Sequence, residues 1–187
     1  MSKAKEVEIK VRISENDVAR LEKELFNQDF SRFTESDTYF TAPVRDFMET
    51  NECLRIRQRN GKPIELTYKG KTTEEMRNKE QFWKEEIDLP VENIEDTEQL
   101  LFAVGCERLV KVVKDRKKKE MDGKVITLDR IEDTGAFLEV ETEAVERDVQ
   151  KAVKDNRKFL EKLGLEKMEV VKKPYRDLVM DSKGISY

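Results

Sequence analysis

Apolar and ionisable residues alternate strictly over residues 6–13, near the start of the chain. One phase is apolar and the other charged: Val7, Ile9, Val11 and Ile13 against Glu6, Glu8, Lys10 and Arg12. Successive side chains of a strand point to opposite faces, so the alternation predicts a β-strand with one buried and one charged face. Glu6 and Glu8 would then be close neighbours, and they repel unless water screens them or a cation lies between them.

The same alternation returns along the chain and predicts further strands. These cover residues 35–40, 52–60, 64–69, 81–89, 108–118, 124–131 and 137–142, with a short strand at 169–171. Asn60-Gly61 and Asp122-Gly123 are typical of tight hairpin turns, which favours antiparallel pairing of their neighbours.

Helical spacing of apolar residues predicts four helices between these strands. They cover residues 15–27, 93–104, 148–163 and 174–180. Ser14 is the expected N-cap of the first helix, with Asp17 supporting its first turn. The second helix would turn inward its residues Ile94, Leu100, Leu101 and Val104. Residues 71–79 show no periodicity and read as a polar loop, and the absence of repeats or linkers favours a single domain over 1–187.

Composition narrows the classes of function. The chain has 187 residues, with 37 basic and 41 acidic ones, which argues against a wholly basic surface for nucleic acids. No apolar run is long enough to span a bilayer and no signal peptide is recognisable, so we expect a cytoplasmic protein. Cys53 and Cys106 lack metal-binding spacing and are expected to be reduced and packed. The absence of histidine removes the usual general base and most zinc sites.

Charge is sorted by strand on the polar phases. Acidic residues fall on the first strand and on late strands: Glu6, Glu8, Asp129, Glu139 and Glu141. Basic residues fall on the middle strands: Arg55, Arg57, Lys69, Lys84, Lys114 and Arg116. Such sorting of charge by strand is what a cupped or closed sheet with a polar interior, and with helices on its outer face, would need. Carboxylates suit Mg²⁺ or Mn²⁺, and basic groups suit phosphate oxygens. The alternative is a solvated sheet stabilised by ion pairs.

Residues 6–10, Glu-Val-Glu-Ile-Lys, match the ExExK motif of the CYTH superfamily, the triphosphate tunnel metalloenzymes. The rest of the chain resembles the class IV adenylyl cyclase branch of this superfamily, in order along most of its length. The matching segments are Asp37-Thr38-Tyr39-Phe40, Pro43, Arg45-Asp46-Phe47, Leu54-Arg55-Ile56-Arg57, Leu66-Thr67-Tyr68-Lys69-Gly70, Lys84-Glu85-Glu86, Lys114-Asp115-Arg116, Leu128-Asp129 and Phe137-Leu138-Glu139-Val140-Glu141.

The resemblance implies an α+β fold, an antiparallel eight-stranded β-barrel or tunnel with helices packed outside. It implies metal ligands for Mg²⁺ or Mn²⁺ among Glu6, Glu8, Asp129, Glu139 and Glu141. It implies triphosphate-binding roles for Lys10, Arg55, Arg57, Lys69, Lys84, Lys114 and Arg116, with Glu86 in the same polar lining. Catalytic roles would belong to Lys10, Arg116, Glu139 and Glu141.

Three activities remain open from the sequence. The first is an adenylyl cyclase, in which the ribose 3′-OH of ATP attacks the α-phosphorus and pyrophosphate leaves. The second is a triphosphatase acting on inorganic triphosphate, a nucleoside triphosphate or thiamine triphosphate, and the third is a non-catalytic polyphosphate-binding module. Bacterial class IV cyclases carry a His-Phe pair before the first motif, which this sequence lacks. The expected partner is a triphosphate rather than nucleic acid or a membrane, and a homodimer is compatible with the resemblance.

Overall fold

The structure is a computed structural model that describes residues 5–71 and 86–186. Eight strands form one sheet: β1 (Lys5–Ile13), β2 (Ser31–Thr41), β3 (Cys53–Arg59), β4 (Ile64–Lys69), β5 (Glu86–Val91), β6 (Glu107–Met121), β7 (Lys124–Ile131) and β8 (Gly135–Ala144). The helices are α1 (Glu15–Glu24), α3 (Ile94–Ala103), α4 (Val149–Lys162) and α5 (Tyr175–Ser182), with a short 3₁₀ turn η1 (Glu146–Asp148).

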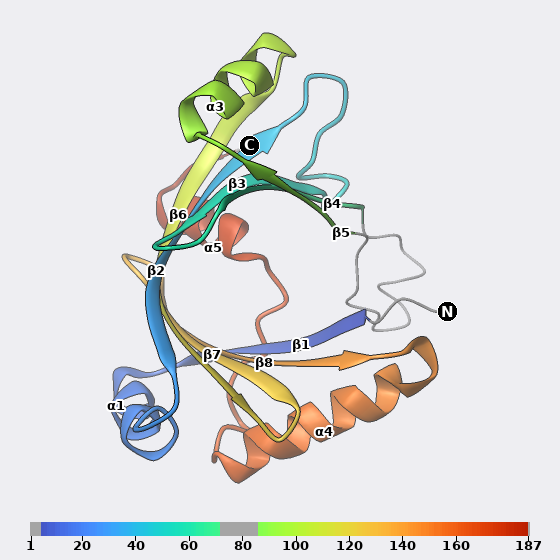
Figure 1. Cartoon of the computed structure of the whole chain (residues 1–187). Helices are drawn as coiled ribbons and strands as arrows, with labels where there is room; N and C mark the ends of the chain where they lie inside the picture. Colours follow the sequence, from blue (N-terminus) through green and yellow to red (C-terminus); the bar gives the residue numbers. More distant parts are fainter. Residues whose placement is uncertain (1–4, 72–85, 187) are drawn as a thin grey trace. The chain divides into compact units, whose positions relative to one another are not determined.

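The strand order is β1-β8-β7-β6-β2-β3-β4-β5, and each pairing with a known register is antiparallel (Figure 1). This confirms the predicted α+β fold with an antiparallel eight-stranded sheet. The order has two ends, β1 and β5, so the sheet is open within the described residues. Closure into a tunnel therefore stays a prediction. No helix among the described residues is long and apolar enough to cross a membrane.

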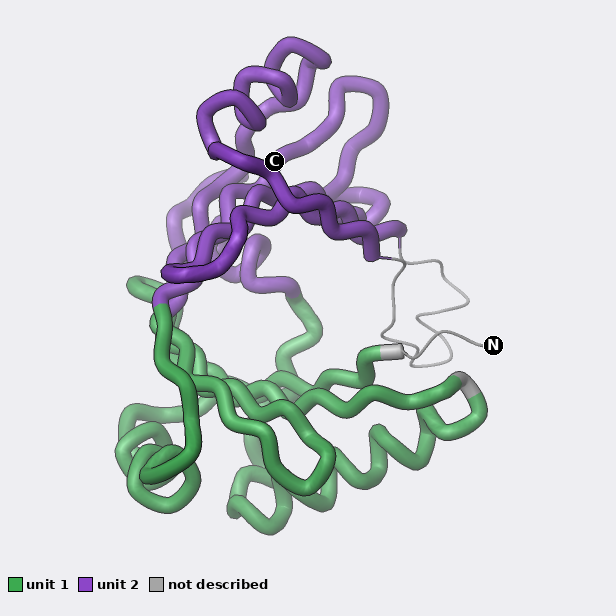
Figure 2. The backbone as a smooth tube through the Cα atoms, in the orientation of Figure 1, with its two compact units in different colours: residues 1–33, 81–83, 115–173 green, residues 34–80, 84–114, 174–187 purple. Residues whose placement is uncertain are grey.

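Backbone contacts divide the chain into two compact units (Figure 2). Unit 1 comprises residues 1–33, 81–83 and 115–173, and unit 2 comprises residues 34–80, 84–114 and 174–187. The long strands β2 and β6 each contribute residues to both units. The prediction of a single domain is not tested by this division.

The core of unit 1 lies between the apolar face of its strands and two helices. Val7, Ile9, Val11 and Ile13 are all buried, as the alternation predicted. They belong to one cluster with residues of β7 and β8, with Val18 and Leu21 of α1, and with Phe159 and Leu160 of α4. Figure 1 shows α4 running along β1 and β8. Because α4 packs on this apolar face, the polar side chains of the same strands lie on the face that α4 does not cover.

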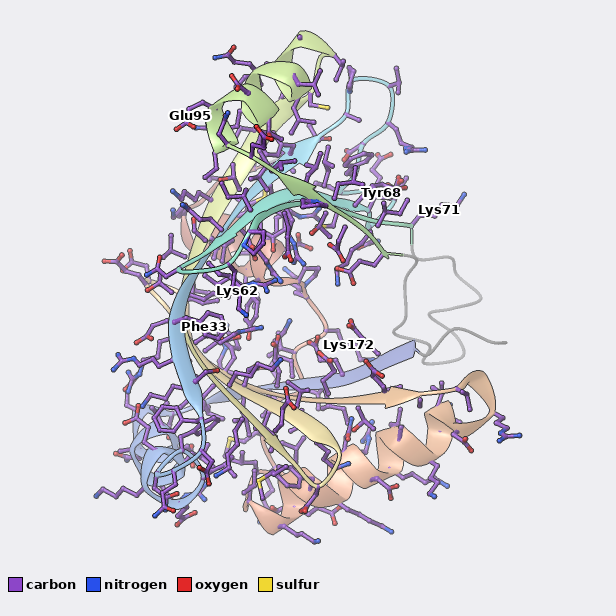
Figure 3. All side chains as sticks on the ribbon, in the orientation of Figure 1. Phe33, Lys62, Tyr68, Lys71, Glu95 and Lys172 are labelled. Carbon is purple, nitrogen blue, oxygen red and sulfur yellow. The ribbon has the colours of Figure 1, made fainter. Side chains whose placement is uncertain are left out.

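Unit 2 has a smaller apolar cluster on the other phase of its strands. Phe40, Ile56, Leu101 and Cys106 are buried together. Tyr68 of β4, labelled in Figure 3, also belongs to this phase and donates a hydrogen bond to the buried carboxylate of Glu52. Both cysteines are free thiols, as expected.

Two local signals read from the sequence are confirmed. Ser14 caps α1 in a reciprocal capping box, because its hydroxyl accepts from the Asp17 amide at 3.2 Å and the Asp17 carboxylate accepts from the Ser14 amide. Asp122 and Gly123 both have positive φ, 51° and 67°, which is the backbone of a tight type I′ hairpin turn. Such a turn fixes the register of β6 against β7.

Other boundaries differ from the prediction. Helix α1 ends at Glu24 rather than near residue 27, and the segment after it still buries Leu25 and Phe26. Strand β5 continues through Pro90, which an edge strand tolerates because one side of its backbone needs no sheet partner. The predicted first part of this strand, 81–85, lies outside the described residues.

The prediction for the inward face of α3 was partly wrong. Thr97 and Leu101 are buried, whereas Leu100 and Val104 are 61% and 60% exposed. Residues 97 and 101 are one turn apart and therefore lie on the same face of the helix. Only this narrow face is buried, because the apolar cluster that the helix covers is small.

Candidate functional site

A ladder of ionisable side chains runs across β1 and β8 in unit 1. The antiparallel register places Glu8 directly opposite Glu141 and Lys10 directly opposite Glu139. Directly opposed side chains lie on the same face of a sheet and are its closest cross-strand neighbours. The structure therefore brings together four residues that were predicted separately from two distant parts of the sequence.

Glu139 accepts hydrogen bonds from two side chains outside this ladder. Its Oε2 accepts hydrogen bonds from Arg116 Nη2 at 2.8 Å and from the Thr127 hydroxyl at 3.1 Å. Lys10 Nζ lies 3.9 Å from Glu139 Oε1 and 4.0 Å from Glu8 Oε1. Only 11% of the Glu139 side chain is exposed, so these charges interact in a poorly solvated environment. Two predicted catalytic residues, Lys10 and Arg116, thus both contact a third, Glu139.

Asp129 binds the guanidinium of Arg116. Arg116 Nε donates to Asp129 Oδ1 at 2.6 Å, and Nη2 donates to the other carboxylate oxygen. Asp129 is completely buried. This two-point contact fixes the plane of the guanidinium, which also reaches Glu139. Asp129 stays a predicted metal ligand, but in this structure its oxygens orient Arg116.

Glu6, the remaining predicted metal ligand, lies on the same face of β1 and is exposed. Its partner in the register is Glu143, which sequence reasoning did not select. The face therefore carries a second pair of opposed carboxylates beyond Glu8 and Glu141. Both pairs repel in the absence of a cation.

The carboxyl group of Glu8 is shifted towards its protonated form. Burial and the nearby carboxylates of Glu139 and Glu141 raise the pKa of Glu8 from 4.5 to about 8, although Lys10 acts in the opposite direction. The Glu8 side chain is 41% exposed, so water screens part of this repulsion.

We expect Glu8→Gln to raise the melting temperature of the metal-free protein at pH 8 and above. Native Glu8 holds its proton up to a higher pH than the unfolded chain does, so its contribution to stability falls as pH rises from about 4.5 to about 8. Glutamine does not titrate and escapes this loss. Melting curves of both proteins in EDTA between pH 4 and 9 would measure it, and a difference that is constant across this range would contradict the shift.

The donor chemistry of this face fits a hard divalent cation. Oxygen donors from carboxylates are the ligands that Mg²⁺ and Mn²⁺ prefer. Within residues 5–71 and 86–186, no three side chains of the types that bind metals lie close enough to form a complete cage. Mg²⁺ is commonly held by one or two carboxylates together with water and substrate phosphates, and an incomplete protein cage is compatible with such a role.

Of the predicted basic residues, Arg116 belongs to unit 1, whereas Arg55, Arg57, Lys69 and Lys114 belong to unit 2, where strand register defines a polar face. Asp37 lies opposite Arg57, Tyr39 opposite Arg55, and Lys69 opposite Glu86. Among the described residues this face carries five cationic side chains, Arg55, Arg57, Arg59, Lys69 and Lys114. It also carries five carboxylates, Glu35, Asp37, Glu65, Glu86 and Asp88.

This balance corrects the expected sorting of charge by strand. The middle strands do not form a purely basic wall, because β2 and β5 supply carboxylates beside every cation. Glu35 and Asp37 were missed as site residues. The signal was present, since Glu35, Asp37 and Tyr39 share one phase of their strand, as Glu6 and Glu8 do in theirs. Lys84, another predicted triphosphate ligand, lies outside the described residues.

Asp37 is a buried carboxylate of unit 2 that contacts several cationic side chains. Arg57 Nε and Nη2 donate to its two oxygens at 2.6 and 2.8 Å, and Lys114 Nζ lies 3.2 Å away. Glu35 contacts the same Arg57 at 3.0 Å and also pairs with Lys114. Burial alone would raise the pKa of Asp37, but Lys114, Arg57 and Arg55 outweigh it and hold this pKa well below 3.8.

Arg55 and Lys69 are held more loosely. Arg55 Nη1 lies 3.9 Å from Asp37, and its Nη2 lies 3.6 Å from Glu86. Its Nε is buried and has no hydrogen-bond partner within the described part of the chain. Lys69 Nζ contacts Glu86 at 2.9 Å, in a pair where both side chains are about a quarter exposed. A buried guanidinium with an unsatisfied donor is suited to receive an anionic oxygen.

The sequence of this chain is similar to a known protein family and to a named relative. The model of the CYTH domain family matches residues 4–175. A Methanocaldococcus jannaschii protein named "putative adenylate cyclase" is 30% identical over 175 residues, which is 92% of this chain and 97% of that protein.

Solved structures with the same fold are also known. A protein from Pyrococcus horikoshii is 32% identical with a TM-score of 0.79, covering 94% of this chain and 98% of its own. A Hippeastrum "putative adenylyl cyclase", described as having a dominant triphosphatase activity, has a TM-score of 0.63 at 16% identity and covers 99% and 98%. With its ExExK strand, its opposed glutamates and a family match over most of its length, this chain belongs to the CYTH domain family.

Proposed function

We propose that this chain is a divalent-metal-dependent enzyme that acts on a triphosphate, as an adenylyl cyclase that converts ATP to cyclic AMP and pyrophosphate. The observation that carries the proposal is the register of β1 against β8, which opposes Glu8 and Glu141 beside Lys10 and Glu139. Two opposed carboxylates on one sheet face are unfavourable in isolation. They become favourable when a cation shares them.

In this proposal Mg²⁺ or Mn²⁺ would be held by two carboxylates at a time from among Glu8, Glu139 and Glu141, with water and substrate phosphates as its other ligands. Glu6 lies at the exposed end of the same face. The ion supplies Lewis-acid polarisation and charge neutralisation at the phosphoryl group. Lys10 and Arg116 bring positive charge beside these carboxylates, and Asp129 keeps the Arg116 guanidinium in a fixed plane. Positioned charge of this kind stabilises the negative charge that develops on phosphoryl oxygens.

The cations of unit 2 would bind the phosphate oxygens. Arg55 and Lys69 are the best suited, because neither is held in a two-point contact by a buried carboxylate. Arg57 and Lys114 are already neutralised by Asp37 and Glu35, so they would add positive potential and fixed donors. Phosphoryl transfer depends mostly on positioning and electrostatics, which is consistent with a chain that has no histidine.

A triphosphatase is the second candidate, because the same carboxylates and cations would serve hydrolysis of a terminal phosphoryl group. The Hippeastrum protein, described as having a dominant triphosphatase activity, shares the fold. The two reactions differ in which phosphorus meets the nucleophile. A polyphosphate binder without catalysis is disfavoured, since binding alone would not need the opposed carboxylates.

The test is a product assay by ³¹P NMR. Purified protein is incubated with ATP or with tripolyphosphate, with Mg²⁺ and Mn²⁺ separately, from neutral to alkaline pH. Pyrophosphate with cyclic AMP establishes the cyclase, and orthophosphate with ADP or pyrophosphate establishes the triphosphatase. Tight binding without product would leave only the binding module. Neither binding nor product would indicate a solvated sheet stabilised by ion pairs.

A further inference from the structure

Four of the five carboxylates on the polar face of unit 2 form ion pairs and fall into two classes by exposure. The side chains of Glu35 and Asp37 are 2% and 0% exposed, and hydrogen-bonded guanidinium groups hold them. The side chains of Glu65 and Glu86 are 31% and 26% exposed. Buried ion pairs are costly to break, whereas partly exposed pairs contribute little and exchange readily. Only the second class can give way to a ligand.

Among the partly exposed carboxylates that the structure describes on this face, Glu86 is the one that bridges two predicted phosphate ligands. Its Oε2 lies 2.9 Å from Lys69 Nζ, and its Oε1 lies 3.6 Å from Arg55 Nη2. These cations come from two different strands, β4 and β3. Glu86 thus presents one oxygen to each cation, as a phosphoryl group would. Its strand, β5, is at the end of the sheet order, where fewer backbone contacts restrain it.

We propose that Glu86 is a built-in counter-anion that occupies Arg55 and Lys69 until a triphosphate displaces it. The carboxylate neutralises the two cations in the ligand-free protein. An incoming phosphoryl group takes the same contacts and leaves Glu86 to water. Because Glu86 must be displaced before the triphosphate can bind, it lowers the affinity of the protein for this ligand. This inference rests on the proposed binding of triphosphate and goes beyond it by assigning a residue that opposes binding.

The loose geometry at Arg55 supports exchange rather than permanent pairing. Its contacts with Glu86 and Asp37, at 3.6 and 3.9 Å, are longer than hydrogen bonds. The unsatisfied Nε of Arg55 is a donor that Glu86 leaves unused in this structure. A phosphoryl group, with more oxygens and more charge than a carboxylate, could satisfy both Lys69 and this guanidinium.

The test is calorimetric titration with tripolyphosphate in EDTA, so that metal binding plays no part. The variant Glu86→Gln is compared with wild type, and Glu65→Gln serves as the matched control. Glu65 pairs with Arg59 at 2.9 Å and is similarly exposed, but Arg59 is not a predicted ligand. We expect Glu86→Gln to bind about fivefold more tightly, the scale of one partly exposed ion pair. Glu65→Gln should stay within about twofold of wild type on the same scale.

The outcomes separate this inference from the proposed function. Wild type that binds tripolyphosphate neither in EDTA nor with Mg²⁺ would count against the proposed function itself, and if it binds only with Mg²⁺, the variants are compared under that condition. Binding by wild type that Glu86→Gln leaves unchanged or weakens would overturn the counter-anion role, because Glu86 would then be neutral or would help to hold the ligand. Glu86→Ala provides a second variant, and melting temperatures verify that each protein is folded. An equal gain in Glu65→Gln would also overturn the role, since it would reflect net charge alone.

Discussion

Glu139→Gln is expected to lower turnover by at least about a hundredfold, the scale of losing one group that stabilises transition-state charge. Glu139 is the carboxylate that Lys10, Arg116 and Thr127 all contact. The proposed metal would lose one of its oxygen ligands, and the positive groups would lose their shared partner. Initial rates with ATP and tripolyphosphate, in Mg²⁺ and in Mn²⁺, would measure the loss.

The fold should survive this change. Removing the Glu139 charge relieves repulsion with Glu8, and Arg116 keeps its contact with Asp129. Glu143→Gln is the matched control, because Glu143 lies on the same strand and face, is exposed, and is opposed by Glu6. If Glu139→Gln unfolds while its folded fraction keeps full specific activity, the metal role is wrong. If Glu143→Gln loses as much activity, the effect reflects the charge of the face rather than Glu139.

Asp37→Asn is expected to lower the free energy of unfolding by about 3–5 kcal/mol, the usual cost of removing one partner from a buried ion pair. Asp37 is completely buried and accepts both hydrogen bonds from Arg57, with Lys114 at 3.2 Å. Without its charge, these cations remain buried, and among the described carboxylates Glu35 is left to compensate them. Urea unfolding at neutral pH would measure the difference.

Asp88→Asn is the control for this experiment. Asp88 is an exposed carboxylate on the same face that accepts a hydrogen bond from Thr67 at 2.6 Å, and its loss should cost well under half as much. The penalty in Asp37→Asn should also depend on pH in a defined direction. The cations lower the pKa of Asp37 below 3.8, so its stabilising charge is present above that pH and is lost as the pH falls through the lower native value. A penalty that declines already between pH 7 and 5 would contradict this account.

Local sequence patterns were sufficient to predict most of the helices and strands. Strand β7 has the predicted limits, 124–131, because a tight turn at Asp122-Gly123 and a second turn after Ile131 bound a clear alternation. The capping box at Ser14 located the start of α1. Errors arose where tertiary contacts decide, as in α3, whose exposed Leu100 and Val104 follow the same apolar spacing as the buried Leu101.

For the candidate site, too, the local pattern showed some features and the tertiary structure decided others. Alternation placed Glu6, Glu8 and Lys10 on one face of a strand, and it did the same for Glu139 and Glu141. It could not show that Glu8 opposes Glu141, because register depends on pairing between segments far apart in the chain. Alternation also placed Arg55 and Arg57 on one face of their strand, but it could not show that Glu35 and Asp37 of the neighbouring strand β2 neutralise Arg57.

The sequence by itself determined which side chains share a face of each strand, because the two-residue period is a property of the extended backbone. It also carried the family motifs that led to the expected antiparallel sheet and triphosphate chemistry. Only the tertiary structure decided which charges meet. It paired Asp129 with Arg116, buried Asp37 beneath Arg57 and Lys114, and left Glu86 bridging Arg55 and Lys69. Coulomb interactions depend on distance and burial, and both are set by strand order and register, which no local pattern encodes.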